Sequence, residues 1–309
     1  MKFGQKESTS LPIDPKLPNP SGLSIECVLR LKEKALETEL LHGLPIWGNP
    51  SWIGKIYPHN LKVKNFLYSY SRQFPSIELN STFYGCPKEE TLKAWRDLVP
   101  SDFIFCPKLP KSISHGKDIY KTKEETQLFF NRIQTLRETL GPCFLQFPKY
   151  FEASQFSWLQ SLAKLLPKEF KLSIELRHSS WFREGQAIPE LLQFLLDQNL
   201  GLVITDAPSK REVLHSEVTS DHLLIRFLGQ NLECSDNPRL KEWATKLQKL
   251  KSLNFPSLYF FLHQPNDDFA PELAHDFVTL LNTETEFKLK NWEIPKESEE
   301  EINHSLHLF

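Results

Sequence analysis

The two stretches that decide the fold are LLIRFLG at residues 223–229 and SLYFFLH at residues 257–263. Both are nearly continuous apolar runs, which is typical of parallel strands whose two faces are covered. The segment between them, residues 238–253, has the apolar spacing of an amphipathic helix. Together they predict a strand, a crossover helix and a second parallel strand.

The same alternation extends back to residue 43. Six further short apolar runs occur, at residues 44–47, 76–80, 102–108, 143–147, 171–177 and 201–206. Helices are predicted at 60–73, 88–98, 122–140, 154–166, 187–199 and 271–281, whereas the connection 208–220 has the weakest helical pattern. Eight strands alternating with about eight helices predict an α/β protein, specifically a TIM (β/α)8 barrel over residues 43–281. A dinucleotide-binding fold is not supported, because no glycine-rich phosphate motif follows the first predicted strand.

The flanking segments are predicted as additions to this single domain. Residues 1–21 are polar and proline-rich, which predicts a flexible or extended arm. Residues 22–42 have helical spacing and predict an N-terminal helix. Residues 282–309 are charged and predict a C-terminal appendage, with Trp292 as its anchor.

Composition excludes several classes of protein. The chain has 309 residues, a formal net charge of −2, 40% hydrophobic residues and only 11 glycines, which is typical of a soluble globular protein rather than a disordered or collagen-like one. No apolar run approaches the roughly 18 residues of a membrane helix, and no signal peptide is evident. The five cysteines form no C-x-x-C pair, which favours reduced thiols and a cytoplasmic location. A pI of about 6.6 shows no overall basic surface for nucleic acid.

Polar side chains stand at the carboxyl ends of the predicted strands, where the active sites of TIM barrels lie. Glu78, Asn80 and Thr82 alternate with a period of two, which places them on one strand face, and Glu175 and Arg177 do the same. The remaining ends carry Trp47, Asn49, Lys108, Gln146, Asp206, Arg226 and His263. Buried charges need partners, so structural ion pairs such as Glu78 with Lys108 or Arg177 with Asp206 are an alternative. Convergence of so many strand ends favours a pocket.

Several strings along the chain resemble one known family. They are WGNPSWIGKIYP (47–58), IELNSTFYGCP (77–87), WRDLVPSDFIFCPKLPKSISH (95–115), GPCFLQFP (141–148), IELRHSSWF (174–182), ITDAP (204–208) and IRFLGQ (225–230). Over about residues 44–281 the chain resembles the domain of unknown function 72 family, the YecE-like TIM barrels. The resemblance implies a TIM barrel, and it implies little chemistry because the family's activity is unassigned.

The family's motif positions map onto residues already singled out and onto several others. They fall on Glu78, Asn80, Thr82, Phe83, Tyr84, Lys108, His115, Gln146, Pro148, Glu175, Arg177, His178, Trp181, Asp206 and Arg226. The chain departs from the family in two places. It has no histidine after Arg226, and its eighth predicted strand ends in His263-Gln264-Pro265-Asn266 rather than in asparagines.

The residue types favour acid–base chemistry on a small polar or anionic ligand, phosphorylated or sugar-like. The candidate catalytic residues are Glu78, Glu175, Asp206 and His263, and the candidate ligand-binding residues are Asn80, Thr82, Tyr84, Lys108, His115, Gln146, Arg177, His178, Trp181 and Arg226. We expect Arg226 and Lys108 to hold an anionic group while a glutamate transfers a proton. If the strand ends form a site that excludes water, burial would raise the pKa values of the two glutamates toward neutrality.

Two other functions stay open at this point. No cofactor is predicted, but Glu175, His178, Asp206 and His263 are residue types that bind divalent metals, so a metal-assisted, nucleic-acid-processing barrel is a less favoured reading. A non-catalytic ligand-binding protein is the other. Several aromatic residues, Trp181 among them, lie near the predicted strand ends. Such residues more often pack a loop onto the barrel than stack against a bound base or sugar. The sequence gives no indication of a membrane partner or of an oligomeric state.

Overall fold

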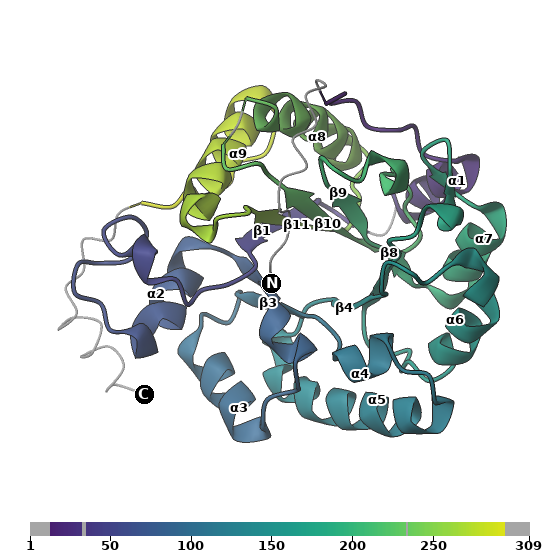
Figure 1. Ribbon diagram of the computed structural model, residues 1–309. Helices are drawn as coiled ribbons and strands as arrows, with labels where there is room; N and C mark the ends of the chain where they lie inside the picture. Colours follow the sequence, from purple (N-terminus) through teal and green to yellow (C-terminus); the bar gives the residue numbers. More distant parts are fainter. Residues whose placement is uncertain (1–12, 33–34, 233, 294–309) are drawn as a thin grey trace.

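The computed structural model describes residues 13–32, 35–232 and 234–293. Helices and strands alternate along the chain, and the helices lie outside the strands (Figure 1). The strands are β1 (Glu39–Leu44), β2 (Ser76–Leu79), β3 (Ile104–Pro107), β4 (Cys143–Gln146), β5 (Leu172–Glu175), β6 (Phe182–Arg183), β7 (Gln186–Ala187), β8 (Gly201–Leu202), β9 (Ile204–Asp206), β10 (His222–Leu228) and β11 (Ser257–His263). The α-helices are α1 (Gly22–Leu31), α2 (Phe66–Gln73), α3 (Glu89–Leu98), α4 (Lys111–Ser114), α5 (Ile119–Ile133), α6 (Phe156–Ala163), α7 (Pro189–Gln198), α8 (Asp236–Ser252) and α9 (Ala270–Glu284).

The prediction of a closed TIM barrel is wrong for this structure. The central strands form two separate sheets, one of six strands in the order β3-β2-β1-β11-β10-β9 and one of three in the order β4-β5-β8. Both sheets are parallel throughout, and β6 and β7 form a small antiparallel hairpin apart from them. The alternation of strands and helices was therefore predicted correctly, but the continuous ring of strand pairing was not.

The pairing of neighbouring strands is interrupted at two places. At one of them prolines lack the N–H that would donate a hydrogen bond, and at the other the paired strand is very short. Between β3 and β4 only isolated bridges occur, one of them Lys108 with Phe144, and two prolines, Pro107 and Pro142, lack an N–H at this seam. At the other seam, β8 pairs with β5 over two residues, Val203 belongs to no strand, and β9 then pairs with β10. The predicted strand 201–206 is thus divided between the two sheets.

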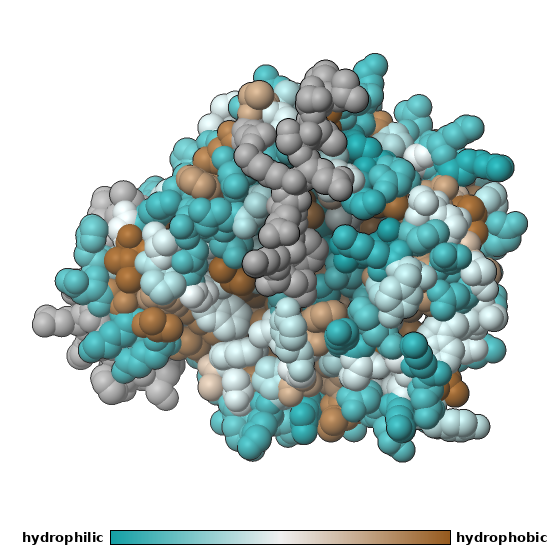
Figure 2. Space-filling view, viewed as in Figure 1, coloured by the Kyte–Doolittle hydropathy of each residue, from teal (hydrophilic) through white to brown (hydrophobic). Residues whose placement is uncertain are grey.

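The two sheets nevertheless share one apolar interior. Its buried side chains come from strands of both sheets and from Val203, and they are Leu41, Cys106, Phe144, Val203, Leu224, Tyr259 and Phe261. Because side chains alternate along a strand, Arg226 shares the inward face of β10 with Leu224. The larger core lies between the strands and the surrounding helices. On the molecular face shown in Figure 2, hydrophobic residues are scattered among hydrophilic ones, as is usual for a protein surface.

The N-terminal helix and the first strand differ from their predicted bounds. Helix α1 begins after Ser21, whose hydroxyl accepts a hydrogen bond from the Ser24 amide, and it ends at Leu31 rather than at residue 42. Residues 39–44 form β1 instead, because they pair in register with β11 on one side and reach β2 on the other. Tertiary pairing here overrides the helical spacing of the sequence. Gly43 permits this pairing, since a Cβ there would lie 2.1 Å from the Ser76 carbonyl oxygen.

Both flanking segments contact the domain where they are described. Arg211 donates to the Lys16 carbonyl oxygen at 2.9 Å, so this part of the predicted arm lies against the body. In the C-terminal segment, Trp292 Nε1 donates to the Pro271 carbonyl oxygen at 2.7 Å, as expected of an anchor. Residues 1–12 of the arm and 294–309 of the appendage lie outside the described residues. None of the described helices combines the length and apolar character needed to cross a membrane.

Candidate functional site

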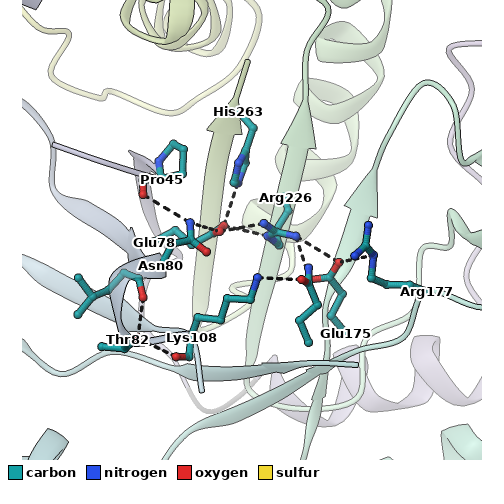
Figure 3. Close-up of polar contacts among 11 residues, drawn as sticks. Pro45, Glu78, Asn80, Thr82, Lys108, Glu175, Arg177, Arg226 and His263 are labelled. Atoms are coloured by element: carbon teal, nitrogen blue, oxygen red, sulfur yellow. Dashed lines mark hydrogen bonds and ion pairs between the residues drawn. The ribbon is translucent and has the colours of Figure 1, made fainter. Parts of the chain in front are cut away.

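A buried arginine joins two glutamates from different sheets. Arg226, on β10, donates from Nε and Nη2 to the two carboxylate oxygens of Glu78 on β2, both at 2.9 Å (Figure 3). Its Nη1 donates to Glu175 Oε2 on β5 at 2.9 Å. All three side chains are essentially excluded from solvent. The planar guanidinium suits this double carboxylate contact, which a lysine could not make in the same way.

Four further side chains surround these three. His263 Nε2 lies 2.9 Å from Glu78 Oε2, and Asn80 Nδ2 donates to Glu78 Oε1 at 2.8 Å. Gln146 links the other side, because its Nε2 donates to Glu175 Oε2 at 2.7 Å and its Oε1 accepts from Lys108 Nζ at 2.8 Å. We call the set of Glu78, Lys108, Gln146, Glu175, Arg226 and His263 the central cluster.

The two glutamates are ionised rather than protonated. Burial by itself raises the pKa of Glu78, but Arg226 and then His263 outweigh it and hold that pKa well below its usual value. Burial likewise raises the pKa of Glu175, and Arg226 and Arg177 lower it to a net value below the usual one. The expectation that both pKa values rise toward neutrality is therefore wrong, because Arg226 stabilises the ionised form of both carboxylates, with His263 and Arg177 contributing.

Lys108 is the group of the cluster whose pKa moves toward neutrality. Its side chain is buried, and its Nζ lies 4.4 Å from the centroid of the Phe83 ring. Burial, followed by repulsion from Arg226, lowers the pKa of Lys108 to about 8, against the opposing attraction of Glu175 and Glu78. Its ammonium therefore gives up its proton closer to neutral pH than that of an ordinary lysine.

A pocket opens beside the central cluster. Its cavity of about 280 Å³, which we call the rim pocket, is lined by Phe83, Tyr84, Lys111, His115, Gln146, Phe147, Pro148 and Arg177. Gln146 belongs to the central cluster and also lines the rim pocket, so it lies between the pocket and the side chains of Lys108 and Glu175. Tyr84 is 73% exposed and stands at the outer side.

The lining of the rim pocket is positively charged. Lys111 and Arg177 contribute cations, and none of the lining residues is acidic. Arg177 Nε lies 3.9 Å from Glu175 Oε1, so it connects the pocket to the cluster. Burial and then the nearby Lys111 lower the pKa of His115. Such a lining suits an anionic ligand with a small apolar or aromatic part.

Asp206 lies apart from this site. Its carboxylate accepts hydrogen bonds from Arg211 Nη1 at 2.6 Å, from Trp243 Nε1 at 2.8 Å and from Arg239 Nε at 3.3 Å. Arg239 and Trp243 are on α8, so Asp206 faces the helix layer. Its strand neighbour is Phe227, the residue next to Arg226 and therefore on the opposite face of β10. The alternative ion pair with Arg177 does not form.

Three other predicted ligand-binding residues have local structural contacts. Strand β2 ends at Leu79, so Thr82 leaves the period of two, and its hydroxyl donates to the carbonyl oxygens of Leu79 and Lys108. His178 Nδ1 accepts from the Ser180 amide at 3.2 Å and caps the turn that follows β5. Trp181 is fully buried, and its Nε1 donates to the Phe151 carbonyl oxygen at 2.7 Å. The loop-anchor reading of this tryptophan agrees with its position.

The residues considered as metal ligands are not gathered together. Within the central cluster, Glu175 contacts Arg226 and His263 contacts Glu78, while His178 and Asp206 have the separate partners given above. Among residues 13–32, 35–232 and 234–293, no group of three or more His, Cys, Asp or Glu side chains is arranged to hold a metal ion.

Sequence reasoning missed part of the pocket lining. Lys111 and Phe147 were not singled out, although both lie close to chosen residues in the sequence. The available signal was the spacing of Lys111 and His115, four residues apart at the two ends of the short helix α4 that follows β3. Tyr84, His115, Gln146 and Arg177 were predicted ligand-binding residues, and all four line the pocket.

Comparison with known proteins points to one family. The sequence model described as "Protein of unknown function DUF72" matches residues 41–299. UPF0759 protein YecE of Escherichia coli strain K12 is 30% identical over 251 residues, covering 75% of this chain and 89% of YecE. UPF0759 protein YunF of Bacillus subtilis strain 168 is 25% identical over 205 residues, covering 61% of this chain and 70% of YunF.

Solved structures of similar proteins bear the same family name. A DUF72 family protein from Thermotoga maritima superimposes with a TM-score of 0.63 at 26% identity, covering 79% of this chain and 99% of that one. A DUF72 family protein from Enterococcus faecalis V583 gives a TM-score of 0.65 at 22% identity, covering 84% and 99%. None of these names describes a reaction or a ligand.

Proposed function

The chain belongs to the DUF72 family, and we propose that it is an enzyme acting on a small anionic molecule. In this proposal the rim pocket binds the anionic group, and the central cluster beside it supplies proton transfer. The observation that carries the proposal is the rim pocket itself, whose lining contains Lys111 and Arg177 and no carboxylate. Its volume of about 280 Å³ is close to the lower end of the range for small-molecule sites.

The cationic role moves from Arg226 to Arg177 in this proposal. Arg226 is engaged by Glu78 and Glu175, so it orients the two carboxylates instead of holding a ligand. Arg177 reaches the pocket, and a guanidinium can grip a phosphate or carboxylate with two parallel hydrogen bonds.

Two groups are suited to act beside the bound anion. Glu175 is ionised and is linked to the pocket through Gln146, so it can stabilise a developing positive charge. Lys108, with a pKa of about 8, can exchange its proton near neutral pH. A catalytic group is most effective when its pKa is near the operating pH, which favours Lys108 as the exchanging group.

Titration calorimetry with inorganic phosphate and glyceraldehyde 3-phosphate tests the binding step. Arg177→Gln should weaken binding by about tenfold to a hundredfold, because a charge-assisted hydrogen bond is removed. Lys64→Gln, at an exposed lysine outside the pocket, is the matched control and should leave affinity unchanged. Equal affinity of wild type and Arg177→Gln, or no binding at all, would contradict the anion site.

Incubation with a mixture of phosphorylated and carboxylated metabolites tests the catalytic step. Mass spectrometry should show that wild type consumes one component and that Lys108→Met does not. Binding through Arg177 without any turnover would instead favour a non-catalytic ligand-binding protein.

A further inference from the structure

Lys108 is held in an arrangement that leaves its amine available for chemistry. Its Nζ donates one hydrogen bond, to Gln146 Oε1 at 2.8 Å, and faces the Phe83 ring at 4.4 Å. Within the described part of the chain it forms no ion pair with a carboxylate, because Arg226 occupies both Glu78 and Glu175. A lysine placed only for stability would be expected to contact one of the two carboxylates.

The lowered pKa of Lys108 favours a neutral amine more than that of an ordinary lysine does. Burial and Arg226 lower the pKa of Lys108 to about 8. At pH 7.5 roughly a quarter of such amines are neutral, against roughly a thousandth for an ordinary lysine. Desolvation beside a second cation is also the way in which known enzymes prepare a lysine nucleophile.

The amine lies directly behind the wall of the rim pocket. Phe83 and Gln146 line the pocket, and both contact Lys108 Nζ. A ligand held by Arg177 and Lys111 therefore has Gln146 between it and the amine. Lys108 is fully buried and does not itself line the pocket, so the Gln146 side chain must turn aside before a carbonyl oxygen on that ligand can replace its amide oxygen as the hydrogen-bond acceptor of Nζ. This exchange brings the carbonyl carbon next to the nitrogen.

We infer that Lys108 is a nucleophile that forms an imine with a small anionic aldehyde or ketone bound in the rim pocket. The neutral amine adds to the carbonyl carbon, the new C–N bond forms, and the carbonyl oxygen takes up a proton. The nitrogen then loses a proton, and the hydroxyl leaves as water after protonation, which gives the protonated imine. No oxidant or reductant is required. Glu175 is linked to Lys108 through Gln146 and attracts its positive charge, so it can stabilise the developing cation.

This inference rests on the proposed function, since the anionic group must bind before the amine reacts. It narrows the substrate class from any small anion to one with a carbonyl group. It also assigns Lys108 a covalent role that proton exchange alone would not require.

Reductive trapping with sodium borohydride tests the inference on the full-length protein. Wild type is incubated with glyceraldehyde 3-phosphate at pH 7.5, reduced, and digested for peptide mass mapping. We expect one adduct, on Lys108, with labelling suppressed by inorganic phosphate and much weaker with unphosphorylated glyceraldehyde. Lys108→Arg should abolish the adduct. Lys64→Arg, at the exposed lysine outside the pocket, is the control and should leave the Lys108 adduct in place.

Two results would overturn the inference and can be told apart from failure of the anion site. If glyceraldehyde 3-phosphate binds in an Arg177-dependent manner but no adduct forms on Lys108, the nucleophile is wrong and the anion site stands. If the adduct lies on Lys111, or spreads over surface lysines and persists in Lys108→Arg, the nucleophile is equally wrong. If the probe does not bind at all in calorimetry, the anion site and the inference both fail.

Discussion

Arg226→Met removes the cation that holds two buried carboxylates. Arg226 donates four hydrogen bonds, two to Glu78 and two to Glu175, at 2.9 to 3.2 Å. Removing one partner of a buried ion pair costs about 3–5 kcal/mol, chiefly because the remaining charge stays buried without compensation. We therefore expect Arg226→Met to lower the free energy of unfolding by about that amount at pH 7.

The destabilisation caused by Arg226→Met should become smaller as the pH is lowered from 7 to 5. This direction follows from the shifted pKa values of Glu78 and Glu175. In wild type the pKa of each glutamate is below its unfolded value, so both stay ionised and stabilised at pH 5. Without Arg226 burial dominates and raises these pKa values, so the carboxyls of the variant take up protons between pH 7 and pH 5. The destabilisation should therefore shrink by roughly 1–3 kcal/mol over that range.

Urea denaturation at pH 7 and pH 5 measures both quantities. Arg183→Met, at an exposed arginine on β6, is the matched control and should change stability by less than about 0.5 kcal/mol. Combining Arg226→Met with Glu78→Gln and Glu175→Gln should recover part of the loss, because the two buried carboxylates that Arg226 had compensated are then removed as well. A loss below about 1 kcal/mol at pH 7, or a loss equal at both pH values, would refute this reasoning.

Two further predictions concern Lys108 and Asp206. The pKa of Lys108 is about 8, below its unfolded value, so the unfolded chain binds the extra proton between pH 8 and about pH 10.4. Wild type should therefore gain about 3 kcal/mol relative to Lys108→Met as pH rises through that window, and urea midpoints showing a constant difference would contradict the shift. Asp206→Asn should destabilise the protein by about 3 kcal/mol, because Arg239 loses one of its two buried carboxylate partners and keeps only Asp236, while phosphate affinity in calorimetry stays unchanged. Loss of phosphate binding in a variant of wild-type stability would instead return Asp206 to the site.

The central cluster was largely predictable from the sequence, because side chains alternate between the two faces of a strand. Residues two apart share a strand face, and the carboxyl ends of parallel strands meet at one edge. This reasoning brought Glu78, Glu175 and Arg226 together correctly. It failed for Asp206, since the face that a single strand-end residue occupies depends on register, and β9 aligns Asp206 with Phe227.

Other features depend on tertiary contacts that no local pattern contains. The number of apolar runs does not specify which strands pair, so the gaps at the β3–β4 and β8–β9 seams could not be derived from it. Arg226 suits either a ligand or two carboxylates, and only the geometry shows that Glu78 and Glu175 engage it. The direction of the pKa shifts of Glu78 and Glu175 follows from their contact with Arg226, so it could not be predicted from the sequence either.

The most direct test of the proposed site is a crystal structure of the protein with glyceraldehyde 3-phosphate bound. We predict that the phosphate lies in the rim pocket within hydrogen-bond distance of Arg177 and Lys111, with the carbonyl group directed toward Gln146 and Lys108. A phosphate bound elsewhere, with the rim pocket empty, would contradict the assignment of this pocket as the substrate site.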